Sequence, residues 1–306
     1  MDERARSRAA AREKSGMLYG FLGVAAFSLT LPFTRIAVAY FDPTFIGLGR
    51  ALAAAVLAGI LLWVTRQPLP TKRQVRSLAV IGLGVILGFP LLSAWAISRL
   101  PSSHGAIVLG LLPLATALAG TIRAGERPSP RFWLASVAGS AIVVSFALIS
   151  SGGQVSPPDL ALLGAVAAAA VGYAEGTRLT HELGGWQVIS WTLVLGAPFI
   201  VVPVVLAAGR QLAPPTIEAW LAFAYLACIS QFAGFFAWYR GLALGGVARV
   251  SQLQLLQPFL TLGVSALLLG EVITPLTMVA AVLVLATVAL GRRARVRSII
   301  DAQPEE

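Results

Sequence analysis

Residues 256–275 read LQPFLTLGVSALLLGEVITP, and residues 111–130 read LLPLATALAGTIRAGERPSP. Both stretches begin Leu-x-Pro, continue through mostly apolar or small residues to a Gly-Glu pair, and end on a proline four residues after the glutamate. The identical aligned pairs are Leu111/Leu256, Pro113/Pro258, Thr116/Thr261, Gly125/Gly270, Glu126/Glu271 and Pro130/Pro275. A sequence motif that recurs in the second half of the chain predicts that the two halves are internal repeats of each other.

The composition indicates a membrane protein. Of the 306 residues, 57% are hydrophobic and 12% are charged, whereas a soluble domain carries about 25% charged residues. The net charge of +10 does not indicate nucleic acid binding, because most Lys and Arg lie in short segments between long apolar stretches. The single cysteine, Cys228, excludes an internal disulfide and a cysteine-based metal cluster.

Several apolar segments are long enough to cross a bilayer as helices, which takes about 20 residues. The basic stretch before the first segment resembles the start of a signal peptide, but the apolar run that follows is too long for one. The loops between segments are too short to form a separate soluble domain. The ten predicted spans are approximately 16–39, 44–65, 77–98, 102–123, 131–150, 159–177, 186–207, 217–238, 246–268 and 274–291.

The distribution of basic residues predicts the orientation. If the N-terminus is cytoplasmic, the outer loops hold only Arg99 and Arg210, and nearly all other Lys and Arg fall on the cytoplasmic side. Both termini are therefore predicted to be cytoplasmic. Since each half has five spans, an odd number, the halves cross the membrane in opposite senses. The predicted fold is all-α, with ten transmembrane helices as two inverted five-helix repeats around a central cavity. The predicted segments are a basic tail at 1–15, repeats at 16–150 and 151–291, and a tail at 292–306.

The phrase QPFLTLGVSALLLGE, with its fainter copy in the first half, resembles the signature of the drug/metabolite transporter superfamily. It is most similar to the ten-helix group made of two EamA-type repeats, and the resemblance covers residues 16–291. The first half departs from the pattern at Arg123, where the family is usually apolar, whereas Arg50 matches a position that often carries Arg. The resemblance implies a bacterial inner-membrane carrier that moves small metabolites outward by alternating access. Aromatic-rich, carboxylate-poor spans are similar to those of aromatic amino acid exporters.

A polar stripe runs along the ninth predicted span, with residues recurring at steps of three or four. Polar groups facing lipid are costly, so these side chains must face other helices or a wet cavity. Bonds between helices are one explanation, but glutamines at 252, 254 and 257 favour a role in lining the cavity. The stripe consists of Ser251, Gln254, Gln257, Thr261 and Ser265.

Other candidate cavity residues lie on the third, sixth, seventh and eighth spans. For the tryptophans and tyrosines near helix ends, anchoring at the membrane surface is the alternative explanation. The candidates are Ser230, Gln231, Trp238, Tyr239, Trp95, Tyr173 and Trp191, of which Trp95 is either an outer-side gate or an anchor.

Two prolines and two pairs of glycines suggest where helices bend or approach. Pro113 and Pro258 occupy equivalent, near-central positions, and proline removes a backbone hydrogen bond, so we predict a pair of hinges. The spacing of Gly84 and Gly88, and of Gly172 and Gly176, suits close helix packing.

Charged residues within the spans are few. Arg50 either holds a substrate carboxylate or pairs with Asp42 or a helix end, and we expect the structural pairing. Glu175 stands three residues before Arg178, which predicts an internal ion pair. His104 is a candidate for proton coupling but falls at the outer start of the fourth predicted span. No carboxylate lies in the first span, where small multidrug pumps of the superfamily carry one, so facilitated export fits better than proton coupling.

Catalytic patterns are weak. The sequence HELGG at 181–185 lacks the second histidine of a zinc protease helix, and the chain has 2 histidines in all. No phosphate loop and no nucleophile elbow is present. Glu126 and Glu271, at helix ends, are read as structural. We therefore expect neither an enzyme nor a cofactor or metal.

The predicted function is export of small metabolites, above all amino acids with large apolar or aromatic side chains. The expected partners are this solute and the lipid bilayer, without nucleic acid, and the protein is expected to work as a monomer. One alternative is a carrier for nucleotide sugars or other anions, which would need two or more basic cavity residues where Arg50 stands alone. The other is a proton-coupled efflux pump, which would need a carboxylate near the middle of the membrane.

Overall fold

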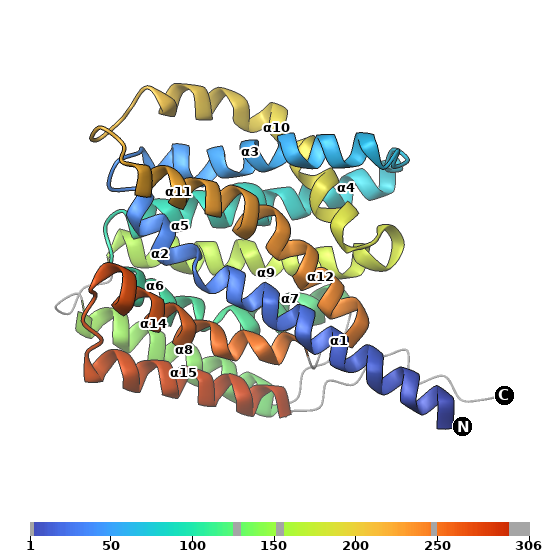
Figure 1. Cartoon of the computed structure of the whole chain (residues 1–306). Coiled ribbons are helices and arrows are strands. Elements are labelled where there is room, and N and C mark those ends of the chain that lie inside the picture. Colours follow the sequence, from blue (N-terminus) through green and yellow to red (C-terminus); the bar gives the residue numbers. More distant parts are fainter. Residues whose placement is uncertain (1–2, 125–129, 151–155, 246–249, 294–306) are drawn as a thin grey trace.

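The computed structural model describes residues 3–124, 130–150, 156–245 and 250–293, and within them the chain is helical without strands (Figure 1). Most of these elements are α-helices; η1 and η2 are π-helical and η3 is a 3₁₀ helix. The first half contains α1 Glu3–Ser28, α2 Thr30–Ala37, α3 Pro43–Val64, α4 Lys72–Ile81, η1 Gly82–Gly88, α5 Phe89–Ile97, α6 Ser102–Leu109, α7 Leu112–Ala124 and α8 Pro130–Ser150. The second half contains α9 Pro157–Leu183, α10 Gly185–Ala208, α11 Ile217–Tyr225, η2 Leu226–Ala233, α12 Gly234–Gly245, η3 Ser251–Leu256, α14 Gln257–Leu269 and α15 Pro275–Arg293.

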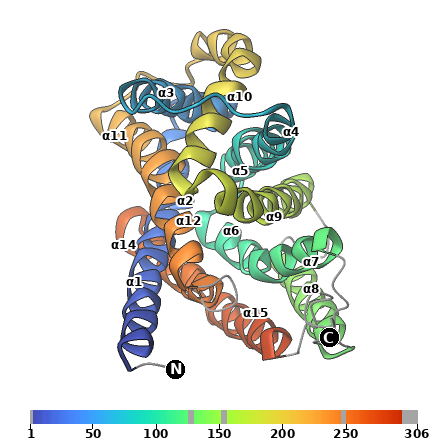
Figure 2. The same ribbon diagram turned by 90° about the vertical axis from the view of Figure 1, so that its right-hand side faces the viewer.

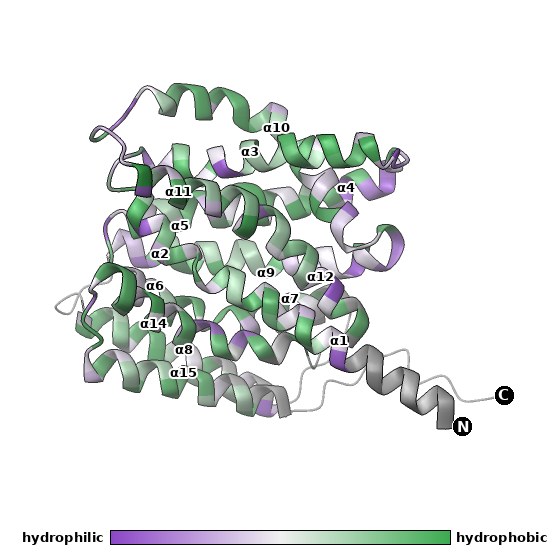
Figure 3. Ribbon diagram, viewed as in Figure 1, coloured by the Kyte–Doolittle hydropathy of each residue, from purple (hydrophilic) through white to green (hydrophobic). Residues whose placement is uncertain are grey.

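The helices form a multi-pass membrane bundle. Eight stretches are long and apolar enough to span a membrane, and two shorter apolar helices, Gln257–Leu269 and Pro275–Thr287, fall within the ninth and tenth predicted spans. Hydrophobic residues occupy the middle of most helices, whereas hydrophilic residues gather at helix ends, for example at the start of α4 (Figure 3). The all-helical prediction is confirmed, and the count of ten spans stays a prediction.

Local signals in the sequence explain where several helices begin. Asp42 accepts a hydrogen bond from the Thr44 amide at 2.7 Å and caps α3. Thr71 and Gln74 form a capping box at the start of α4. These capping residues satisfy amide groups that the first turn of a helix leaves unpaired, so short polar segments suffice to separate the spans.

The two halves interlock through pairs of helices. α1 packs along α12, α3 along α10, and α8 along α15, so each pair takes one helix from each half (Figure 2). α9, the first helix of the second half, packs against η1, α5 and α7 of the first half. The centre of the molecule is therefore built from both halves.

Both copies of the Leu-x-Pro phrase mark a change of helix. α6 ends at Leu109 and α7 begins at Leu112, one residue before Pro113. In the other half η3 gives way to α14 at Gln257, one residue before Pro258. Proline has no amide hydrogen and suits the first turn of a helix, where that hydrogen would have no partner. The two prolines thus fix equivalent breaks, while their role as hinges stays a prediction.

The third and eighth predicted spans share a second irregularity. Each contains a π-helical segment, η1 in one and η2 in the other, separated by nearly the same distance along the chain as the two copies of the phrase. A Cβ built on Gly84 of η1 would collide with the Ala168 backbone oxygen of α9, and one built on Gly172 of α9 would come 2.8 Å from the Val85 side chain of η1. The predicted close packing of these glycines is therefore present between η1 and α9.

Candidate functional site

A small cavity lies where the two halves meet. Its volume is about 20 Å³, room for roughly one water molecule, so an organic solute would enter only after the surrounding helices separate. The first half contributes Phe27, Thr30, Arg50, Val85, Phe89 and Leu112, and the second half contributes Ala169, Tyr173, Ser230, Gln231, Phe235 and Gln257.

Two hydrogen bonds at the cavity join the halves. The Gln231 side chain in η2 donates through Nε2 to the Val85 backbone oxygen in η1 over 3.2 Å. A π-helical turn displaces carbonyl groups from the regular helical ladder, and a side-chain amide can then take the place of a backbone donor. The hydroxyl oxygens of Thr30 and Ser230 lie 2.8 Å apart. Polar side chains therefore hold together the irregular segments that form the cavity.

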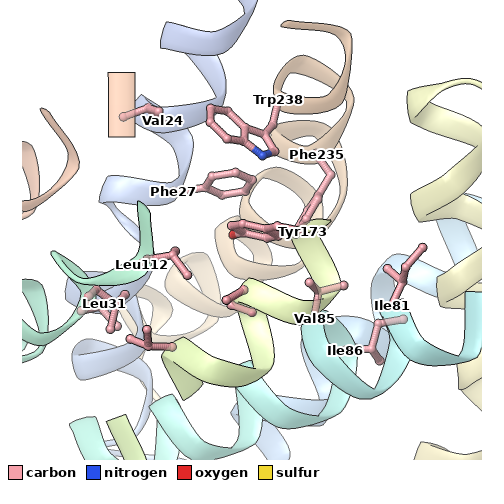
Figure 4. Close-up of a cluster of buried hydrophobic side chains, with 14 of the residues drawn as sticks. Val24, Phe27, Leu31, Ile81, Val85, Ile86, Leu112, Tyr173, Phe235 and Trp238 are labelled. Atoms are coloured by element: carbon pink, nitrogen blue, oxygen red, sulfur yellow. The ribbon is translucent and has the colours of Figure 1, made fainter. Parts of the chain in front are cut away.

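Aromatic residues of the cavity lining belong to a cluster of buried hydrophobic side chains (Figure 4). The ring centroid of Phe27 lies 5.0 Å from that of Phe235 and 6.5 Å from that of Tyr173. Trp238 packs next to these rings: its ring centroid lies 6.4 Å from that of Phe27, and the residue is 2% exposed. These four residues, called here the aromatic cluster, offer the stacked and edge-to-face surfaces that favour an apolar or aromatic group.

Arg50 is the charged residue of the cavity. It lies on α3, is 2% exposed, and its Nε has no hydrogen-bond partner. No carboxylate of the described residues lies within ion-pair distance of it, and Asp42 instead caps α3. The expected pairing of Arg50 with Asp42 is therefore wrong, because the short Asp42 side chain is engaged at the helix start, outside the cavity. A buried cation without a counter-ion is costly.

Glu271 shows how the chain treats a charge at the ends of the helices. Its carboxylate accepts the amides of Ser102 at 2.9 Å and Ser103 at 2.8 Å and so caps α6. Burial alone would raise the pKa of Glu271, but the hydrogen bonds from Ser103 and Ser102 outweigh it and hold the pKa below its usual value. Its predicted structural role agrees with this geometry; Glu126 lies outside the described residues.

Other buried charges are paired as well. Glu175 and Arg178 form the predicted ion pair, with 2.5 Å between Oε1 and Nη2. His104 Nε2 lies 2.7 Å from Asp159 Oδ1, and this pair connects α6 to α9. His104 is thus buried against a carboxylate, away from the cavity lining.

The polar candidates from the sequence separate into two groups. Tyr173, Ser230, Gln231 and Gln257 line the cavity. Thr261, by contrast, donates to the Ser28 backbone oxygen over 2.8 Å and so joins two helices.

Two further residues of the polar stripe, Gln254 and Ser265, do not line the cavity. Gln254 is 2% exposed, and neither atom of its amide group has a partner in the described part of the chain. The side chain of Ser251 is outside the described set. Ser265 donates to the Thr261 backbone oxygen at 2.7 Å within its own helix.

The aromatic candidates fall in several places. Trp238 and Tyr239 are fully buried, so neither is an anchor at the membrane surface. Trp238 belongs to the aromatic cluster, and Tyr239 packs against α9 at Gly176. Trp95 lies beneath the Arg99 guanidinium at 4.2 Å. Trp191 lines a separate groove between α3 and α10.

Some lining residues were not identified from the sequence. The first span contributes Phe27 and Thr30, the third contributes Phe89, and the eighth contributes Phe235. A signal existed for the first span, because Ser28, Thr30 and Thr34 place hydroxyl groups within an apolar run. No pattern of residues signalled the π-helical segments that turn their neighbours toward the cavity.

The described residues contain no group of three or more His, Cys, Asp or Glu that could hold a metal ion. The lining residues of the cavity can recognise a ligand by hydrogen bonds, by aromatic contacts and by one positive charge.

Comparison with known proteins agrees with this architecture. The EamA-like transporter family model matches residues 14–150 and 156–291. The chain is 45% identical over 279 residues to the uncharacterized transporter YdeK of Bacillus subtilis, covering 91% of this chain and 97% of that protein. It is 26% identical to the probable terminal-alkyne amino-acid exporter of Streptantibioticus cattleyicolor, covering 80% and 84%. A crystal structure with 20% identity superposes with a TM-score of 0.62, covering 91% of this chain and 96% of the other, and thus shares the fold. The chain is a multi-pass membrane protein that belongs to the EamA-like transporter family.

Proposed function

We propose that this transporter exports amino acids with large apolar or aromatic side chains. The observation that carries the proposal is the composition of the central cavity, where amide and hydroxyl groups stand opposite aromatic rings. Gln257 and Tyr173 supply polar contacts for the backbone end of an amino acid, and the aromatic cluster supplies a surface for its side chain. The similarity to a probable terminal-alkyne amino-acid exporter supports the same substrate class.

The proposed membrane arrangement has ten spans in two inverted five-helix repeats, residues 16–150 and 151–291, in the bacterial inner membrane. Both tails are proposed to be cytoplasmic. Two observations support this topology: α1 begins and α15 ends on the same side of the molecule (Figure 1), and the basic residues follow the positive-inside rule. Alternating access then requires the helices around the closed cavity to separate on one side at a time.

We propose further that the carrier is facilitative, works as a monomer and performs no catalysis. Among the described residues, the lining of the cavity contains no carboxylate and no histidine, the groups that a proton-coupled carrier exposes to both sides in turn. The buried carboxylates Glu175 and Asp159 are engaged in pairs away from the cavity.

Counterflow in proteoliposomes tests the proposal. Vesicles loaded with unlabelled phenylalanine should accumulate labelled phenylalanine without a pH gradient. Gln257→Leu should lower the initial rate about tenfold, the usual cost of one lost hydrogen bond to a polar or charged group. Gln211→Leu, the same change on an exposed residue of the loop before α11, is the matched control. Absence of counterflow with every amino acid would refute the substrate class.

A further inference from the structure

We propose that the central cavity is a carboxylate site that recognises organic monoanions with an apolar or aromatic body, and that it does not recognise an amino group. Arg50 binds the carboxylate. The inference rests on the proposed function and refines it: amino acids are transported through their carboxylate, and isosteric anions that lack the amine are transported at least as well.

The first step of the argument is that Arg50 has no counter-ion among the described residues. Its guanidinium is buried on the cavity lining, and no carboxylate of the described chain lies within ion-pair distance of it. The buried carboxylates are committed elsewhere, Glu175 to Arg178 and Asp159 to His104. An unpaired charged residue inside a membrane protein marks a functional site, where a bound ligand can supply the opposite charge. Guanidinium and carboxylate fit each other through two parallel hydrogen bonds.

The second step is that no aromatic ring satisfies this cation instead. Cation–π contacts of the described residues involve Arg99 over Trp95 and Arg240 over Tyr19. Tyr173 lines the same cavity as Arg50, and its phenol hydroxyl can donate a second hydrogen bond to a bound carboxylate.

The third step concerns the amine. The lining holds no carboxylate in the part of the chain that the structure describes. Several of its polar groups already form hydrogen bonds within the protein, Gln231 with Val85 and Thr30 with Ser230. An ammonium group would therefore lose its water without gaining a counter-charge, and Arg50 would repel it. A hydroxyl at the same position needs no counter-charge. Its removal from water costs less.

The net charge of the cargo gives the inference a second consequence. A zwitterion moves no net charge, so its distribution should not respond to voltage. A monoanion carried alone should be driven out of a compartment that is negative inside, by about 50-fold in concentration ratio per 100 mV at equilibrium. Export of such a cargo needs no proton.

Three isosteric probes test the proposal on the wild-type protein. Phenylalanine is a zwitterion, 3-phenyllactate replaces its ammonium group by a hydroxyl and is a monoanion, and phenylalaninamide lacks the carboxylate and is a cation. We expect phenyllactate to inhibit phenylalanine counterflow at least as well as unlabelled phenylalanine, and phenylalaninamide to inhibit at least about tenfold more weakly. Efflux of labelled phenyllactate should accelerate when valinomycin and a potassium gradient set the interior negative, and protein-free vesicles correct for leakage.

The outcomes separate this inference from the proposed function. Phenylalanine counterflow that phenylalaninamide inhibits as strongly as phenylalanine, or that phenyllactate inhibits about tenfold more weakly, would overturn the inference and leave amino acid transport intact. Counterflow of phenyllactate without counterflow of phenylalanine would support the carboxylate site and refute the amino acid proposal. Transport of neither probe would overturn both.

Variants at Arg50 add a second line of evidence. Arg50→Gln should abolish the preference for phenyllactate over phenylalaninamide, whereas Arg50→Lys should retain it in part, because Lys keeps the charge but loses the bidentate geometry. Arg210→Gln, at an exposed position near the start of the loop after α10, is the control for the loss of one positive charge. A preference that survives in Arg50→Gln would overturn the proposal. Since the probe series uses the wild-type chain, it decides the matter even if Arg50→Gln does not fold.

Discussion

Arg50 and Glu271 are both charged residues, one buried and one half-buried, yet the chain treats them differently. The carboxylate of Glu271 accepts hydrogen bonds from two backbone amides and one hydroxyl at the start of α6. The guanidinium of Arg50 faces a closed cavity, with its Nε unpaired. A charged group that has hydrogen-bond partners within the protein stabilises the fold. A buried charged group without such partners lowers stability, and we infer that this chain keeps it to bind a ligand. The two residues therefore predict opposite consequences of mutation.

The largest effect is expected from Arg50→Met. This change should lower phenylalanine counterflow about 100-fold, since it removes the charged partner of the carboxylate. The thermal unfolding midpoint of the purified protein should stay the same or rise, because an uncompensated buried charge is lost. Parallel transport and unfolding measurements check this. A large fall in the midpoint would show that Arg50 is a structural residue and would remove the contrast with Glu271.

Glu271→Ala should behave in the opposite way. The substitution leaves the first amides of α6 without acceptors, which should lower the free energy of unfolding by about 2 kcal/mol. Among the protein that stays folded, transport of phenylalanine should change little, because Glu271 is not part of the cavity lining. Unfolding in detergent titrations, with counterflow normalised to folded protein, measures both. Unchanged stability would contradict the capping role.

Gln231→Leu tests a residue with both kinds of role. Its amide bonds to the Val85 backbone oxygen and also lines the cavity. We expect counterflow to fall about tenfold and stability to fall by about 1 kcal/mol, since the Val85 carbonyl of η1 loses its side-chain donor. Gln231→Glu is the informative companion. A carboxylate there would supply a counter-charge to Arg50 and should abolish transport of anions, and because it cannot donate to the Val85 carbonyl, it should lower stability at least as much as Gln231→Leu.

A smaller effect is expected from acidification. The pKa of Glu271 is lower in the folded protein than in the unfolded chain, so its contribution to stability is fully present above the unfolded value of about 4.3 and is lost as the pH falls through the folded pKa. The difference in stability between the wild type and Glu271→Gln should therefore be constant at neutral pH and shrink below about pH 4. A difference that persists at lower pH would show that the charge of Glu271 does not matter.

The smallest effect is expected from Gln254→Leu. The buried amide of Gln254 has no partner in the described chain and lies apart from the cavity lining, so an apolar group of similar size should change the free energy of unfolding by less than about 1 kcal/mol, and in the stabilising direction. Counterflow should stay close to that of the wild type. A transport loss as large as that of Gln257→Leu would place Gln254 in the substrate path of another conformation.

The sequence predicted the helical class and the two-part organisation because both depend on composition and on a repeated phrase. It predicted Gln231, Ser230, Tyr173 and Gln257 as cavity residues because polar groups in apolar helices must face inward. It misassigned Arg50, since spacing along the chain brings Asp42 near without showing that Asp42 is used as a helix cap. Which face of each helix meets the cavity depends on helix breaks and π-helical turns, which depend on packing between distant segments.

The two π-helical segments also bear on how such a chain arose. Gln231 and Val85 stand 146 residues apart, close to the spacing of the two copies of the repeated phrase, so each half carries the same local irregularity at the same place. A shared irregularity of this kind is most simply inherited from one ancestral repeat that already contained the wider turn. That unit would have paired with a second copy of itself before the two copies became one chain. The bond from Gln231 to Val85 would then descend from a contact between two identical subunits.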